Sequence, residues 1–247
     1  MLATIHQILF YIHIFCGSIG LIVFWLPMLS KKGSSLHIIA GKIFTNGMLM
    51  VAVSGLFMSS FLLLDPVAVR YPDGNLSFEK AQQVTEQSRS LGVFLLMLSL
   101  LVFVNVKHSV LVLKAKGERK ELKGVGHMAS ILSLLLAGIG VGVLAVHKGN
   151  LLFGIFSGLA IVSSLGLLRY IFKQKLKPRE WLIEHLGNII GSGIGAYTAF
   201  FAFGGRRFLS DIFVGQMQIL PWILPGVIGV IASIYLSKKY RKIYRVA

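Results

Sequence analysis

Seven long apolar runs constrain the fold of this chain more than any other feature of its sequence. A helix needs about 20 mainly apolar residues to cross the hydrocarbon core of a bilayer, and each run reaches that length. We therefore predict an all-α, polytopic integral membrane helical bundle that forms a single transmembrane domain over residues 1–247. The expected spans are residues 7–29, 37–64, 91–113, 125–146, 151–172, 181–203 and 212–236, and residues 65–90 form an outer loop.

The composition also indicates a membrane protein. Of the 247 residues, 55% are hydrophobic and only 14% are charged, and the mean hydropathy is +0.77, far above that of a soluble domain. The apolar runs are continuous rather than alternating, which argues against a membrane β-barrel. Within the outer loop, residues 76–89 are expected to form a short surface helix. Pro221 and Pro225 are expected to kink the seventh span, or to split it into an interfacial piece and a span.

The formal net charge of +16 is divided unevenly between the two ends of the predicted spans. Sixteen Lys and Arg residues lie in segments 31–32, 114–123, 173–179 and 238–245. The opposite loops hold Arg70, Lys80, Arg89, Lys148, Arg206 and Arg207. The positive-inside rule then predicts an outer N-terminus and a cytoplasmic C-terminus.

This arrangement also suggests where the protein resides and what it contacts. Anionic lipid headgroups on the cytoplasmic side account for the basic residues, and no nucleic-acid-binding module is recognisable. We expect an integral protein of the bacterial cytoplasmic (inner) membrane that does not bind nucleic acid. The sequence does not indicate an oligomeric state.

Four histidines from four different spans are expected at nearly the same depth. Each lies within roughly 8 Å of the cytoplasmic membrane face, at 1.5 Å per helical residue. Polar residues accompany them, mostly at helical spacing, and these are candidate hydrogen-bonding partners on the same helix faces. The four are His37, His108, His127 and His185, and the candidate partners are Asn105, Glu184, Asn188, Ser130 and Thr45.

Neutral imidazole is the commonest metal ligand in proteins, and its second ring nitrogen usually needs a partner. The four histidines therefore predict a cytoplasmic-side site for a divalent metal, or for haem iron held between two rings, with redox or metal-assisted chemistry. Lys42 and Lys107 either extend to the headgroups or bind an anionic group at the rim of this site. His13, in the outer half, is a weaker candidate.

Other interpretations of the same residues stay open. Interfacial histidines are also satisfied by water and headgroups, without any site. The chain can be a transporter or small-molecule-binding protein whose histidines line an inner vestibule, or a membrane scaffold or assembly factor. No catalytic motif such as H-E-x-x-H or G-x-S-x-G occurs, so the sequence assigns no catalytic residue and no substrate.

Glycines spaced four residues apart predict close helix packing in two spans. The pairs are Gly138/Gly142 in the fourth span and Gly187/Gly191/Gly195 in the sixth.

The first two spans resemble a known family. The stretch "IHIFCGSIGLIVFWLPMLSKKGSSLHIIAGKIFTNGMLM" is similar to the start of a bacterial family of predicted multi-pass membrane proteins, domain of unknown function 2306. The family pattern is a histidine in the first helix and His-Arg-x-x-Gly-Arg opening the second. His13 matches the first part, and His37, Gly41 and Lys42 match the second, whereas Ile38 stands where the family has arginine.

A second stretch, "EHLGNIIGSGIGAYTAFFAF", is similar to a histidine-led helix of that family ending in a Thr-Ala-Phe element. It puts His185 and Thr198 on the family pattern. The resemblance implies a multi-pass architecture and these candidate residues. The family has no established activity, so the resemblance implies no chemistry.

Overall fold

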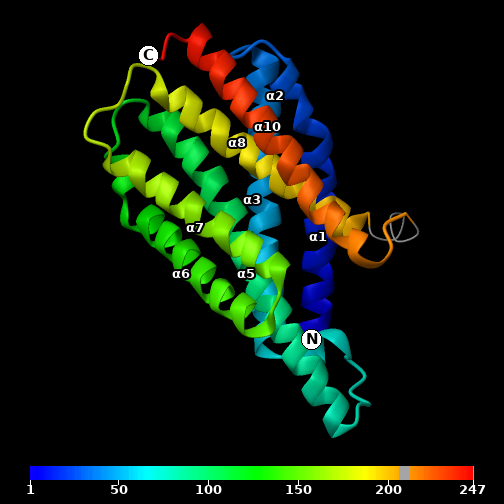
Figure 1. The fold of residues 1–247 in the computed structure, drawn as a ribbon. Coiled ribbons are helices and arrows are strands. Elements are labelled where there is room, and N and C mark those ends of the chain that lie inside the picture. The colour runs from blue at the N-terminus through cyan, green and yellow to red at the C-terminus, as the bar shows by residue number, and fades with distance from the viewer. Residues whose placement is uncertain (206–211, 247) are drawn as a thin grey trace. The chain divides into compact units, whose positions relative to one another are not determined.

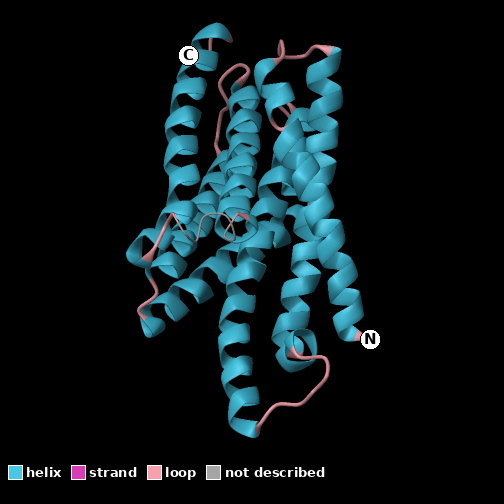
Figure 2. Cartoon of the chain, turned by 90° about the vertical axis from the view of Figure 1, so that its right-hand side faces the viewer, coloured by secondary structure: helices cyan, strands magenta, loops and turns pink. Residues whose placement is uncertain are grey.

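The computed structural model describes residues 1–205 and 212–246, which contain helices and no strand (Figures 1 and 2). Seven helices are long and apolar enough to cross a membrane, which confirms the predicted all-α polytopic fold. The elements are α1 (Leu2–Val23), α2 (Trp25–Leu29), α3 (Ser35–Leu64), α4 (Pro66–Arg70), α5 (Phe78–Ala115), η1 (Glu121–Lys123), α6 (Val125–Lys148), α7 (Leu151–Phe172), α8 (Glu180–Ala199), the π-helix η2 (Phe200–Gly204), η3 (Gly215–Ile219) and α10 (Leu220–Ile243).

The third span is much longer than predicted. Instead of a separate surface helix over residues 76–89, α5 runs without a break for 38 residues from Phe78. At 1.5 Å per residue this is about 57 Å, against a hydrocarbon core of about 30 Å. The physical reason is that residues 78–91 contain no glycine or proline to end the helix, and the Ser77 hydroxyl accepts the Lys80 N–H at its start.

Prolines divide the first and the last spans. α1 ends at Val23, four residues before Pro27, where the proline ring would clash with the helical carbonyl. In the last span, the 3-10 helix η3 precedes α10, whose first turn holds Pro221. The N–H that proline lacks is not needed in a first turn. The seventh span therefore consists of two helical pieces, η3 and α10, and α10 continues past Pro225 to Ile243.

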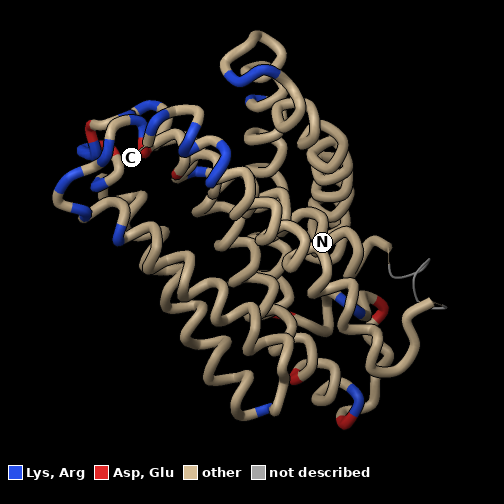
Figure 3. The backbone as a smooth tube through the Cα atoms, turned by 45° about the horizontal axis from the view of Figure 1, so that its top comes forward, with Lys and Arg blue, Asp and Glu red and all other residues tan. Residues whose placement is uncertain are grey.

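The chain forms two compact units. Unit 1 comprises residues 1–18, 46–104 and 129–168, and unit 2 comprises residues 19–45, 105–128 and 169–247. Of the 25 Lys and Arg residues, unit 1 holds only Arg70, Lys80, Arg89 and Lys148. In unit 2 the basic residues gather at helix ends and on the loops that join them (Figure 3). Arg206 and Arg207, predicted in an outer loop, lie outside the described residues.

Within unit 1, glycines bring α6 and α7 into close contact, as predicted for Gly138 and Gly142. A Cβ atom at Gly138 would lie 3.1 Å from Ile161 and 3.2 Å from Ala160, and one at Gly142 would lie 2.7 Å from Ser157 Oγ. The Ser157 hydroxyl uses this proximity to donate to the Gly138 carbonyl at 2.8 Å. These glycines therefore permit a hydrogen bond between two membrane helices.

Within unit 2, the packing prediction is wrong for Gly187 and Gly191, and for Gly195 it stays a prediction. A Cβ atom at Gly187 or Gly191 would meet nothing within 4 Å among the described residues, whereas one at Gly193 would overlap the ring of Phe24. Gly193 lies two residues from Gly191 and hence on nearly the opposite face of the helix. The spacing of Gly187 and Gly191 identified a glycine face, but not the face that packs.

We predict that Gly193→Ala destabilises the protein, whereas Gly191→Ala does not. Phe24 is buried and packs against Phe44 at a ring-centroid distance of 5.4 Å, so its ring has little room to move. Overpacking of this kind costs about 1–3 kcal/mol, and alanine in the open position gains up to ~1 kcal/mol of helix propensity. Thermal unfolding in detergent measures both, and equal melting temperatures for the two variants would contradict the assignment.

Candidate functional site

The start of α8 is fixed by one carboxylate. Glu180 accepts the Lys177 backbone N–H at 2.8 Å and the Lys173 ammonium at 2.6 Å, which ties the first residue of the helix to the turn that precedes it. Because α8 begins at Glu180, Glu184 and His185 follow one turn later and Asn188 two turns later.

Two of the four predicted histidines are in direct contact. His108 Nδ1 on α5 lies 2.9 Å from His127 Nε2 on α6, and the rings stack with their centroids 5.2 Å apart. His108 is 0% exposed and His127 is 3% exposed. One nitrogen of this contact must carry a hydrogen and the other must accept it. The two buried rings therefore share a single proton position.

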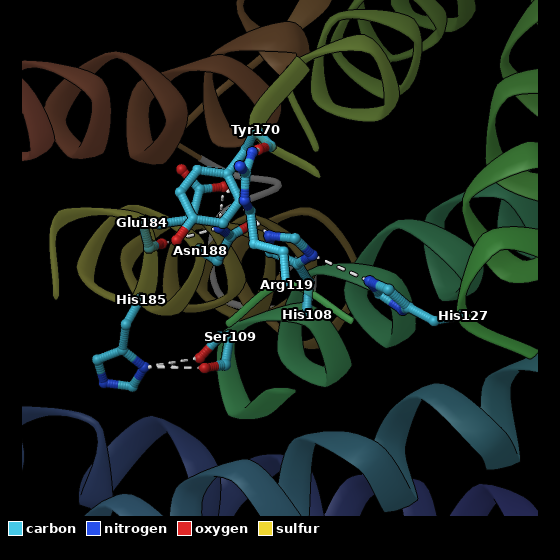
Figure 4. A network of polar contacts seen from close by, with 8 residues as sticks. All are labelled: His108, Ser109, Arg119, His127, Tyr170, Glu184, His185 and Asn188. Atoms are coloured by element: carbon cyan, nitrogen blue, oxygen red, sulfur yellow. Dashed lines mark hydrogen bonds and ion pairs between the residues drawn. The ribbon is translucent and has the colours of Figure 1, made fainter. Parts of the chain in front are cut away.

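Glu184 on α8 joins the pair. Its Oε1 atom lies 3.3 Å from His108 Nε2, and the Glu184 side chain is 24% exposed. The Asn188 amide donates to the same Oε1 at 3.1 Å and to the Glu184 backbone carbonyl at 2.8 Å. The result is a chain of polar side chains, Glu184–His108–His127, that connects three helices in unit 2 (Figure 4). We call it the relay chain.

Tyr170 covers the central histidine. Its ring meets that of His108 edge to face, with centroids 5.7 Å apart and an interplanar angle of 83°. Arg119 donates hydrogen bonds to the backbone carbonyls of Tyr170, Ile171, Lys173 and Gln174. These are carbonyls at the end of α7, which lack helical partners of their own. Arg119 thereby holds the backbone that carries Tyr170.

The other two predicted histidines contact backbone carbonyls instead. His185 Nδ1 lies 3.0 Å from Ser109 Oγ and 3.3 Å from the Ser109 carbonyl, and His37 Nδ1 lies 3.0 Å from the Pro27 carbonyl. A carbonyl oxygen only accepts, so His37 Nδ1 carries the hydrogen, and in the neutral form its Nε2 holds a lone pair. His185 Nδ1 either donates to the Ser109 carbonyl or accepts from the Ser109 hydroxyl. His185 points away from His108 (Figure 4).

Lys32 stabilises the segment that carries Pro27. Its ammonium donates to the carbonyls of Pro27 at 2.7 Å and Met28 at 2.8 Å, and it lies 5.5 Å from the centroid of the Tyr240 ring. Burial lowers the pKa of Lys32, and the positive charge of Lys239 lowers it further. The carbonyl that accepts from His37 is therefore held by a second donor.

The remaining predicted residues make local contacts. The Thr45 hydroxyl donates to the carbonyl of Lys42 at 3.2 Å, and Lys107 Nζ donates to the Gly126 carbonyl at 3.0 Å. Lys42 is exposed. Asn105 precedes His108 by one turn on α5. The roles predicted for these four residues around the histidines stay predictions.

Ser130 follows His127 by one turn on α6, and its role also stays a prediction. His13, in unit 1, contacts Ser54 Oγ at 3.0 Å. Because the Ser54 hydroxyl donates to the carbonyls of Met50 and Val51, the hydrogen in the His13 contact belongs to the imidazole.

The structure thus unites His108, His127, Glu184 and Asn188, and gives His37 and His185 separate partners. Over residues 1–205 and 212–246, no group of three or more His, Cys, Asp or Glu side chains is arranged to hold a metal ion, so the four-histidine metal site gains no support.

Sequence reasoning missed three residues of the site: Ser109, Arg119 and Tyr170. Ser109 was adjacent to a candidate but on another helix face. In the sequence, Arg119 is one of five basic residues in segment 114–123 and carries no sign of a particular role. The position of Tyr170 near the end of the fifth span, at the depth of the histidines, was the one available signal.

Comparisons of the chain with protein-family models, curated proteins and solved structures return no match. The fold and the site define its class: a multi-pass α-helical membrane protein in which a partly exposed glutamate and two buried histidines form a polar chain in one of the two compact units.

We predict that His108 and His127 are energetically coupled. Replacing either with leucine leaves a buried ring nitrogen without its partner, which costs about 1–3 kcal/mol, whereas the double variant leaves neither ring. Unfolding free energies of the two single variants and the double variant should therefore differ from additivity by about 0.5–3 kcal/mol. A matched cycle of His108→Leu with Ser109→Ala is the control, because Ser109 contacts His185 and not His127. The unfolding free energies in this cycle should be additive. Additive values in the first cycle would show that the rings do not interact.

Proposed function

We propose that this protein binds and releases protons at a membrane-embedded acid–base site, the relay chain, and couples this to a small molecule at the cytoplasmic side of the membrane. The observation that carries the proposal is the 2.9 Å contact between the buried rings of His108 and His127, with Glu184 at the far nitrogen of His108. Buried polar groups inside membrane spans are costly and are typically functional.

The relay chain has three arrangements for one added proton. The proton resides on Glu184, or on His108 as an imidazolium between the two partners, or on His127 after His108 Nδ1–H has passed its hydrogen across. In each case every shared position holds one hydrogen. A proton that enters at Glu184 can therefore leave from His127 while the side chains keep their places.

The depth of these residues favours local chemistry over transport across the bilayer. From the ends of their helices, Glu184 is about 6 Å deep, His127 about 3 Å and His108 about 10 Å. The relay chain connects neighbouring helices near one end of the spans and does not cross the bilayer. This supports a site for a small molecule and does not require a transmembrane proton path.

The orientation and location that we propose follow from the charge distribution. The concentration of Lys and Arg in unit 2 supports a cytoplasmic C-terminus and an outer N-terminus, with anionic headgroups around the basic loops. We propose the bacterial inner membrane as the location, in line with the resemblance to domain of unknown function 2306.

Titration of individual histidines tests the proposal. In protein labelled with ¹⁵N-histidine, the ring signals of His108 and His127 should change at the same pH, because they share one proton. Glu184→Gln should displace both midpoints together, although the carboxylate contacts only His108. The exposed His147 provides an internal reference.

Independent midpoints for His108 and His127 would contradict the proposal and would favour the scaffold interpretation. Ser109→Ala serves as the control variant. It removes a hydroxyl partner of His185 and should leave the titration of the other two rings unchanged.

A second candidate function, binding of haem or a divalent metal, is supported by His37 and His185. His37 donates Nδ1–H to a backbone carbonyl, and Nδ1 of His185 lies 3.3 Å from one. Metal-binding histidines usually have this anchoring because it directs the Nε2 lone pair to the metal. His37 and His185 would hold a haem iron or a divalent ion through Nε2, and the bound group would supply redox or Lewis-acid chemistry.

An absorbance scan of purified protein detects bound haem, and elemental analysis detects a bound divalent metal ion. We predict that His37→Ala and His185→Ala each lose any haem or bound ion, and that His127→Ala retains it. Retention in the first two variants, or no uptake of either group on addition of haem or metal salts, would rule out this candidate while leaving the acid–base proposal intact.

A further inference from the structure

The Tyr170 hydroxyl belongs to the site but takes no part in the proton transfer proposed for the relay chain. Tyr170 is 5% exposed, and its hydroxyl has no hydrogen-bond partner among the described residues. Buried hydroxyls in proteins nearly always have a partner. Figure 4 shows the ring over His108 with its hydroxyl on the side of Glu184.

The accessible end of the relay chain is Glu184, at 24% exposure against 0% for His108. On α8, Gly187 and Gly191 lie three and seven residues after Glu184 and therefore share its helix face. A Cβ atom at either glycine would meet nothing within 4 Å. An open strip without side chains therefore leads along α8 to the carboxylate.

We infer that this strip binds a membrane-soluble small molecule that carries a hydroxyl group, with its apolar body against Gly187 and Gly191 and its hydroxyl between Glu184 and Tyr170. This inference rests on the proposed acid–base function, for which it names the class of ligand. The two independent observations behind it are the open glycine face of α8 and the buried, unpartnered Tyr170 hydroxyl.

The chemistry of the two protein groups selects the hydroxyl. A carboxylate only accepts hydrogen bonds, and a phenol both donates and accepts. A ligand hydroxyl donates to Glu184 and accepts from Tyr170, whereas a ketone adds no donor for the carboxylate and an ammonium leaves Tyr170 without an acceptor. When the ligand ionises, its O–H bond breaks and its oxygen keeps the electron pair. The proton passes to Glu184 and along the relay chain to His127.

Binding of a phenol with an alkyl chain tests the inference. The protein in lipid nanodiscs is dialysed against 4-octylphenol, and binding is measured relative to empty nanodiscs, which corrects for partition into lipid. Octylbenzene, which lacks the hydroxyl, is the matched probe. We expect saturable binding of the phenol and none of octylbenzene. Tyr170→Phe should weaken binding about three- to tenfold, because it removes one hydrogen bond.

Gly191→Leu provides a variant that fills the strip without touching the polar groups. Since nothing lies within 4 Å of a Cβ at this position, the fold should be retained and saturable binding should be lost. Equal binding of both probes, or unchanged binding in both variants, overturns the inference. So does a water molecule found bound to Tyr170 in protein that takes up no phenol.

The titration of His108 and His127 separates the two proposals. Coupled midpoints without phenol binding would overturn the ligand class alone, whereas independent midpoints would overturn the acid–base function on which it rests.

Discussion

The hydrogen bond between the buried rings of His108 and His127 determines how the polar part of this membrane protein is arranged. Lipid provides no hydrogen-bonding partner, so a polar group inside a span must be satisfied by the protein or by water that reaches it. His108 is fully buried: its Nδ1 meets this requirement through the hydrogen-bond contact with His127, and its Nε2 lies 3.3 Å from Glu184 Oε1, within ion-pair distance. Three helices, α5, α6 and α8, are therefore held in a defined rotation about their own axes.

The surrounding contacts support this arrangement from the backbone outward. Glu180 fixes the start of α8, Asn188 orients the Glu184 carboxylate, and Arg119 holds the end of α7 that carries Tyr170. Each of these side chains satisfies atoms that a membrane helix leaves unpaired at its ends or along its polar face. The histidines then fall into two chemical classes. One pair shares a proton, and His37 and His185 each contact a backbone carbonyl.

Hydropathy was sufficient to predict the seven spans, because bilayer thickness imposes a minimum length of apolar helix that few other folds contain. Helix ends were less predictable. The start of α5 depends on the absence of a helix-breaking residue over Phe78–Arg89, and not on hydrophobicity. Depth could likewise be read from the sequence, which is why His108, His127 and Glu184 were all candidates.

Rotation about the helix axis could not be predicted in the same way. Adjacent residues His108 and Ser109 reach different partners, His127 and His185, because they are about 100° apart around α5. The same limitation explains Gly191 and Gly193, which occupy nearly opposite faces of α8. Which face of a membrane helix packs is decided by the side chains of its neighbours, such as Phe24, and these are distant in the sequence.

The most direct test of this account is the scalar coupling across the hydrogen bond between His108 Nδ1 and His127 Nε2, measured by NMR in ¹⁵N-histidine-labelled protein in nanodiscs. We predict a resolved nitrogen–nitrogen coupling between these two rings that disappears in His127→Gln and persists in Ser109→Ala. Absence of the coupling in the unmodified protein, with each ring bonded to water or lipid instead, would show that the two histidines do not share a proton.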